Sequence, residues 1–156
     1  MLPLLTRPEE VSARIGQPGE QIDRAVSLSS LSGKRVVIVE DEGVTQMQLR
    51  RILKQVGATV VASATTGETG VEAVLRELPD LVLMDIRMPG AFDGLEAARR
   101  ILSEYYVCLV MLTAFSDEHY RQKAAELNAA GYVIKPITSE TLIPQLEAAL
   151  RSFGQQ

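Results

Sequence analysis

Five polar residues suited to metal or phosphate chemistry stand directly after short apolar runs. They are Glu40, Asp41, Asp85, Thr113 and Lys135. The runs that precede them are Val36–Val39, Leu81–Met84, Val107–Leu112 and Tyr132–Ile134. Each of these residues alone is ordinary, because strand ends are often polar and acidic pairs are usually surface charge. Their combination indicates a site.

The three acids and the two other polar groups suggest complementary roles. Carboxylates that share one pocket repel each other unless a cation compensates or one is protonated. An all-oxygen cluster suits a hard ion such as Mg²⁺, and the cluster has no histidine or cysteine to favour zinc. Lys135 and Thr113 can neutralise or hydrogen-bond the oxygens of an incoming phosphoryl group. Asp85 is then the candidate nucleophile, because an aspartate can accept a phosphoryl group.

The elements that must position these groups follow from the apolar pattern after Lys34. Short, unbroken apolar runs predict strands buried on both faces, and apolar residues at i, i+3, i+4 and i+7 predict helices between them. The predicted strands are 36–39, 58–62, 81–84, 107–112 and 132–134. Four of the predicted helices have a regular apolar face; these faces are Leu49, Ile52, Leu53 and Val56; Val71, Val74, Leu75 and Leu78; Tyr120, Ala124 and Leu127; and Leu142, Leu146, Ala149, Leu150 and Phe153. One further helix, the third in chain order, is predicted from Gly94 to about Ser103.

Five strands that alternate with five helices predict an α/β fold with a parallel sheet and helices on both sides. Sites in such sheets form at the carboxyl ends of the strands, near the point where strand order reverses. The five polar residues should therefore converge on one rim. Ser116 is a candidate cap for the fourth helix, and Pro144 predicts that the last helix begins late or is kinked.

Composition narrows the function classes. The chain of 156 residues fits one ordinary domain, and its 46% of hydrophobic residues can form a core. A net charge of −4 argues against nonspecific nucleic-acid binding as the main task. The single cysteine, Cys108, lies in an apolar run and is expected to be a buried strand residue. Nothing resembles a membrane span or a signal peptide, which favours a cytoplasmic protein.

The two ends of the chain differ from the middle. Residues 1–33 are rich in proline, glycine and serine, and we interpret them as an N-terminal extension that is flexible or partly helical. Residues 34–153 form the predicted domain and 154–156 a short tail. No recognition helix follows, so no direct DNA binding is expected.

These residues resemble the receiver domain of response regulators in two-component signalling. The matching segments are 39–42, 83–90, Asp93-Gly94, 112–114 and 131–136, in the order of the family and at compatible spacing. The resemblance covers about residues 34–153. It implies a flavodoxin-like, doubly wound sheet of order 2-1-3-4-5 in a three-layer sandwich.

The resemblance also implies roles for the polar residues. Asp85 would be the phosphoacceptor, and Mg²⁺, for which Mn²⁺ can substitute, would be bound by Asp41, Asp85, the Arg87 backbone carbonyl and Glu40, the last through water. Lys135 would contact the phosphate, and the peptide bond between Lys135 and Pro136 would be cis. Thr113 and Tyr132 would act as the coupled switch. The chain would catalyse only its own phosphorylation and dephosphorylation and would not otherwise be an enzyme.

The partners that the resemblance implies are proteins. A sensor histidine kinase or a histidine phosphotransfer protein would donate the phosphoryl group, and a downstream effector would read it. A homodimer through the fourth helix, fifth strand and fifth helix is a further expectation.

The sequence departs from the family pattern at three places. Glu40 replaces the commoner aspartate, the stretch 89–94 is one residue longer than usual, and Arg87 and Phe115 are bulky at positions that tune phosphate lifetime.

Three alternatives compete with this interpretation. An aspartate-nucleophile phosphatase of the haloacid-dehalogenase type needs an acid two residues after the nucleophile, where this chain has Arg87. A flavodoxin-like cofactor binder would have to accommodate a flavin phosphate beside acidic loops. A degenerate receiver would act as an adaptor without phosphorylation.

Overall fold

The computed structural model describes residues 29–114 and 118–155. The proposed cap Ser116, the bulky Phe115 and most of the N-terminal extension lie outside these residues. The strands are β1 (Arg35–Val39), β2 (Thr59–Ala64), β3 (Leu81–Asp85), β4 (Cys108–Thr113) and β5 (Gly131–Ile134). The helices are α3 (Gly43–Gln55), α4 (Gly67–Glu77), α5 (Gly94–Glu104), α6 (Glu118–Glu126) and α7 (Ser139–Gly154).

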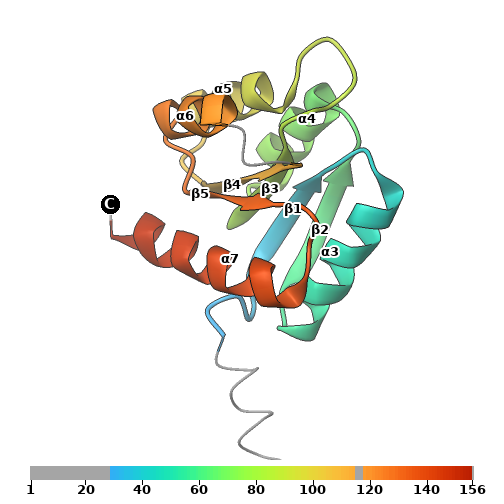
Figure 1. Ribbon diagram of the computed structural model, residues 1–156, viewed down its shortest axis with the longest axis vertical. Helices are drawn as coiled ribbons and strands as arrows, with labels where there is room; N and C mark the ends of the chain where they lie inside the picture. Colours follow the sequence, from blue (N-terminus) through green and yellow to red (C-terminus); the bar gives the residue numbers. More distant parts are fainter. Residues whose placement is uncertain (1–28, 115–117, 156) are drawn as a thin grey trace, which may run out of the picture.

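The five strands form one parallel sheet in the order β2-β1-β3-β4-β5, as predicted. Figure 1 shows α3 and α7 on one side of the sheet and α4, α5 and α6 on the other. The strand order reverses at β1, between the first and second crossovers, so the carboxyl ends of β1 and β3 flank the switch point. The three-layer, doubly wound prediction is confirmed.

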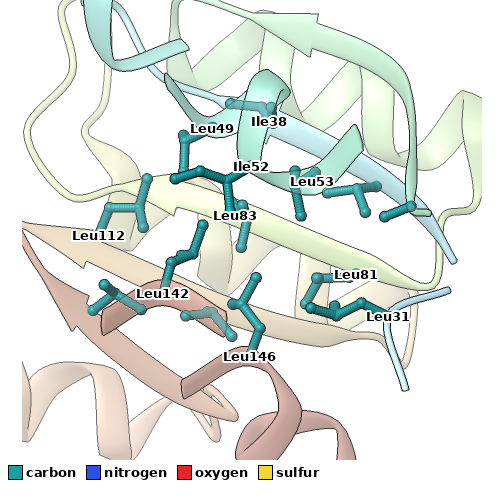
Figure 2. Packing of buried hydrophobic residues seen from close by; sticks show 14 of the residues in the cluster. Leu31, Ile38, Leu49, Ile52, Leu53, Leu81, Leu83, Leu112, Leu142 and Leu146 are labelled. Carbon is teal, nitrogen blue, oxygen red and sulfur yellow. The ribbon is translucent and has the colours of Figure 1, made fainter. Parts of the chain in front are cut away.

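The core has two halves because successive strand residues point to opposite faces. Val36 and Ile38 of β1 pack in the cluster under α3 and α7, whereas Val37 and Val39 pack in the cluster under α4, α5 and α6. Figure 2 shows the first cluster, in which Leu49 of α3 and Leu142 of α7 meet the sheet from the same side. Strands buried on both faces explain the unbroken apolar runs of the sequence.

The first cluster also includes Leu31, a residue of the segment that the sequence assigns to the N-terminal extension. Leu31 is fully buried beside Leu81 and Leu146 (Figure 2). The Ser29 hydroxyl donates a hydrogen bond of 2.8 Å to Glu147 Oε2 on α7. The core therefore takes in residues that precede β1.

The last helix does not begin late, although a late start is one of the two alternatives that Pro144 suggests. The helix α7 begins at Ser139, and Pro144 lies inside it, so a start delayed by the proline is wrong. Thr138 caps the helix by accepting a hydrogen bond from the Thr141 N–H, while the Thr141 hydroxyl bonds back to the Thr138 backbone. This capping and the burial of Leu142 and Leu146 outweigh the loss of one helical hydrogen bond.

Two turns that position the helices depend on unusual backbone conformations. Gly57 follows α3 with a φ of +84°, a left-handed conformation that glycine adopts without steric cost. Leu78 ends α4 with a φ of 48° before Pro79.

Among the described residues, no helix is both long and apolar enough to cross a membrane.

Candidate functional site

The carboxyl ends of β1 and β3 bring together the three predicted acids. Ligand atoms of Glu40, Asp41 and Asp85 all lie within 4.8 Å of one another. Glu40 and Asp85 are buried, whereas Asp41 is exposed. The register explains this proximity, because Val39 pairs with Met84 and the next residue of each strand is an acid. The predicted acidic cluster exists.

Thr113 and Lys135 reach the same rim through the pairing of β3, β4 and β5. Asp85 pairs with Leu112, and Thr113 pairs with Ile134, so each polar residue lies one step further along its strand. The Lys135 N–H donates to the Thr113 carbonyl at 2.7 Å. The bond between Lys135 and Pro136 is cis, as expected.

The Lys135 ammonium lies among three carboxylates. Its Nζ is 2.8 Å from Glu40 Oε1, 3.1 Å from Glu42 Oε1 and 3.3 Å from Asp85 Oδ2. Burial alone would lower the pKa of Lys135, but the three carboxylates together raise it above its usual value. Lys135 is therefore a permanent cation in this pocket.

Glu40 has the most perturbed carboxyl group of the site. Burial raises its pKa to about 7, although Lys135 and the Glu42 N–H favour the charged form. Glu40 Oε2 accepts that N–H at 3.0 Å. Its Oε1 is buried, contacts Lys135 as an ion pair and accepts no well-aligned hydrogen bond within the described residues. The Lys135 ammonium therefore does not fully offset the negative charge of the carboxylates around it.

Sequence reasoning assigned no role to Glu42 or Gln46. Glu42 pairs with Lys135 and accepts a hydrogen bond of 3.1 Å from the Thr45 hydroxyl, and the hydrogen bond from Lys135 lowers the pKa of Glu42. The Gln46 amide donates to the Glu40 carbonyl at 2.7 Å and thereby supports the end of β1. Glu42 could have been found as the third acid of its run. Gln46 gives no such signal.

The turn after Asp85 is tightly closed. The Arg87 N–H donates to Asp85 Oδ1 at 3.3 Å, and the Gly94 N–H donates to the Ile86 carbonyl at 2.8 Å. A Cβ atom on Gly94 would overlap the carbonyl oxygen of Asp85, so this position requires glycine.

An open pocket of about 560 Å³ covers the rim. Its lining includes Asp41, Asp85, Arg87, Thr113, Tyr120 and Lys135. The Arg87 guanidinium lies 5.6 Å from the centre of the Tyr120 ring, so the two side chains meet across the β3 and α6 sides of the opening. Asp85 lines this pocket although the residue as a whole is buried.

The predicted switch residues lie at different depths. Thr113 is buried and lines the pocket, whereas Tyr132 is half-buried and is absent from the pocket lining. The Arg121 guanidinium lies 4.4 Å from the centre of the Tyr132 ring and donates a hydrogen bond to its hydroxyl. In this structure Tyr132 is thus engaged by α6 and not by the acidic cluster.

The donor set fits Mg²⁺. Carboxylate oxygens are the protein ligands this ion prefers, and it binds through one or two of them while it keeps water. Asp41 and Asp85 line an open pocket, and Glu40 adds a buried carboxyl group whose charge lacks full compensation. The residues present are therefore suited to hold a divalent cation.

Comparisons with known proteins agree with this geometry. Residues 36–147 match the family described as response regulator receiver domain. The chain is 38% identical over 122 residues to the transcriptional regulatory protein PdtaR of Mycobacterium tuberculosis, which covers 78% of this chain and 59% of the relative. The chain therefore spans about three fifths of the length of the curated relatives it matches.

Solved structures give the same result. The signal receiver domain of a modulated diguanylate cyclase from Desulfovibrio desulfuricans is 31% identical, with a TM-score of 0.72 over 80% of this chain and 98% of that one. The N-terminal domain of a response regulator/sensory box/GGDEF 3-domain protein from Carboxydothermus hydrogenoformans is 36% identical, with a TM-score of 0.70 over 78% and 98%. This chain belongs to the response regulator receiver family of two-component signalling.

Proposed function

We propose that Asp85 accepts a phosphoryl group from a phosphohistidine on a sensor histidine kinase or histidine phosphotransfer protein. The observation that carries the proposal is the position of the Asp85 carboxylate. It ends the central strand in an open pocket, 3.3 Å from the Lys135 ammonium and beside buried Thr113. Family membership supports the same assignment.

The transfer step requires a carboxylate nucleophile and charge compensation. An Asp85 oxygen forms a bond to phosphorus, and the bond from phosphorus to the donor imidazole nitrogen breaks, so the imidazole keeps the electron pair. Negative charge then lies on the oxygens of the transferred group. Lys135 would neutralise one of them, and the Thr113 hydroxyl would donate to another.

A divalent cation completes the site. Asp41 and Asp85, the Arg87 backbone carbonyl and, through water, Glu40 would hold Mg²⁺, with Mn²⁺ as a substitute. When bound, the ion would supply positive charge that stabilises the negative charge of the transferred group. This chain would catalyse only its own phosphorylation and dephosphorylation.

Phosphorylation would act on other proteins by changing the conformation of one face of the domain. Phosphorylation would draw Thr113 toward the phosphoryl group and release Tyr132 from Arg121, which biases a two-state equilibrium of the α6, β5 and α7 face. A cytoplasmic effector protein, or a second copy of the chain, would read that face.

The test is incubation of the chain with acetyl phosphate and Mg²⁺, followed by intact-mass measurement. Wild type should gain one phosphate, and Asp85→Asn should gain none. Equal uptake without Mg²⁺, or uptake at another residue, would overturn the mechanism. No uptake by correctly folded wild type would favour the phosphorylation-independent adaptor.

A further inference from the structure

The loop between β3 and α5, residues 86–93, is attached at its tip as well as at its base. We call it the acceptor loop. The base is closed by the hydrogen bond from the Gly94 N–H to the Ile86 carbonyl. The tip lies within the stretch 89–94, which the sequence comparison with the family pattern gives as one residue longer than usual. A longer loop gains conformational freedom unless its middle is held.

Glu68, in the first turn of α4, holds that tip. Its Oε2 accepts a hydrogen bond of 3.0 Å from the Ala91 N–H. Its Oε1 is buried without a hydrogen-bond partner in the described part of the chain. Gly90 has a φ of +110°, and a Cβ atom there would lie 2.6 Å from Glu68 Oε1. The loop backbone therefore packs closely against this carboxylate.

Two further contacts attach the loop to the same helix terminus. A Cβ atom on Gly67 would lie 2.8 Å from the Phe92 carbonyl oxygen, so glycine allows the close approach of loop and helix. The Phe92 ring packs against Gly67 on one side and lies 4.0 Å from the Arg100 guanidinium on the other. Glu68 thus acts where the loop already fits closely against α4.

The position of Arg87 in the same loop connects this anchor to the site. Arg87 lies between the closed base and the Glu68 contact, and its N–H contacts Asp85 Oδ1. Mg²⁺ requires near-ideal geometry from its few protein ligands. A loop held at both places restricts the backbone at Arg87, whereas a loop free at its tip leaves that backbone mobile.

We propose that Glu68 is a positioning residue for the metal site, because its hydrogen bond to the Ala91 N–H fixes the acceptor loop and with it the Arg87 carbonyl. This inference rests on the proposed function, which assigns that carbonyl to Mg²⁺. Glu68 itself touches neither the metal nor the phosphoryl group. Its helix-terminal charge would also stabilise α4, so the test must separate the hydrogen bond from the charge.

The experiment measures Mg²⁺ affinity of the unphosphorylated full chain by titration calorimetry, together with hydrogen exchange of the peptide that covers the acceptor loop. Glu68→Ala should weaken Mg²⁺ binding about tenfold, as loss of outer hydrogen-bond partners does at other metal sites. It should also speed exchange in the loop. Glu68→Gln keeps a carbonyl oxygen for Ala91 and should stay within about twofold of wild type.

A matched control is Glu72→Ala, which removes an exposed carboxylate one turn further along α4 and should leave both measurements unchanged. Far-UV circular dichroism checks folding. Should Glu68→Ala fail to fold, Gly90→Ala disturbs the same contact from the loop side and should weaken binding comparably.

The outcomes separate the two proposals. Wild type that binds no Mg²⁺ overturns the proposed function and this inference with it. Wild type that binds while folded Glu68→Ala binds equally well overturns the positioning role alone. If Glu68→Gln is as weak as Glu68→Ala, the charge and not the hydrogen bond is responsible, and the inference is wrong.

Discussion

The two rims of the sheet differ in how far their charged side chains balance one another. At the amino ends of the strands, the Arg35 side chain donates to the Glu77 carbonyl at 2.8 Å and pairs with Glu77 Oε1 at 3.2 Å, and the Arg35 backbone N–H donates to Asp80 Oδ2 at 2.8 Å. At the carboxyl ends, Lys135 faces Glu40, Glu42 and Asp85, while Asp41 stands beside them. Arg76 also pairs with Glu77, at 3.1 Å, so the first rim has two cations for two carboxylates, whereas the second keeps an excess of negative charge.

The difference shows how a stable fold can keep uncompensated negative charge at one edge of its sheet. Surface ion pairs such as that of Arg35 contribute little and tolerate exposure. Buried carboxylates cost free energy unless they are compensated, which is why burial raises the pKa of Glu40. The carboxyl rim retains destabilising negative charge that a bound cation can compensate. Four substitutions test this contrast.

The largest effect is expected from Lys135→Met. Removal of the ammonium leaves buried Glu40 and Asp85 without their cation, so the metal-free protein should lose about 3 kcal/mol of unfolding free energy at pH 8. Urea denaturation in a chelator measures the loss. A midpoint equal to that of wild type would show that Lys135 does not offset the charge of the rim.

Asp41→Asn should weaken Mg²⁺ binding about 100-fold, because it neutralises an exposed carboxylate of the acidic cluster. Phosphate uptake from acetyl phosphate at low Mg²⁺ should fall in parallel, as intact-mass time courses would show. Asp80→Asn at the opposite rim is the matched control and should leave both unchanged. Equal losses in the two variants would contradict the contrast between the rims.

Glu40→Gln should stabilise the metal-free protein by about 2 kcal/mol at pH 8. The folded-state pKa of Glu40, about 7, lies above the ordinary value of 4.5. The stability that comes from the raised pKa of protonated Glu40 is therefore fully present below pH 4.5 and is lost as pH rises through 7. The advantage of Glu40→Gln should vanish near pH 4.5 and grow up to pH 7. Thermal unfolding across that range in a chelator measures it, and a constant difference would argue against the raised pKa.

The smallest effect is expected from Arg35→Met. Its side-chain contacts are partly exposed, so the loss should be about 1 kcal/mol and should not change with pH between 6 and 8. Mg²⁺ affinity should equal that of wild type. A loss as large as that of Lys135→Met would mean that the two rims are equivalent.

The sequence predicts the sheet and the rim well because both follow from strand periodicity. Unbroken apolar runs identify the central strands, and the residue after each run must lie at the carboxyl edge. The approach of Lys135 to Asp85 then depends only on strand order and register. Local patterns are sufficient where the chemistry lies at strand ends.

Contacts between distant loops and turns are not predicted in this way. The burial of Leu31 depends on a turn that folds back beside Leu81 and Leu146, and no periodicity marks it. The Glu68 contact with Ala91 joins residues 23 apart through a backbone N–H, which the side-chain sequence does not reveal. A delayed start of α7, one of the two alternatives that Pro144 suggests, is wrong because the Thr138 cap and two buried leucines outweigh the proline.

The closure at Gly94 has a consequence for how such loops can change. Because the Gly94 N–H meets the Ile86 carbonyl, the two ends of the acceptor loop stay together whatever its contour length. An added residue therefore alters the shape of the loop without moving Asp85. Evolution, or a designer, can vary the loop beside the acidic cluster while the Asp85 carboxylate keeps its place.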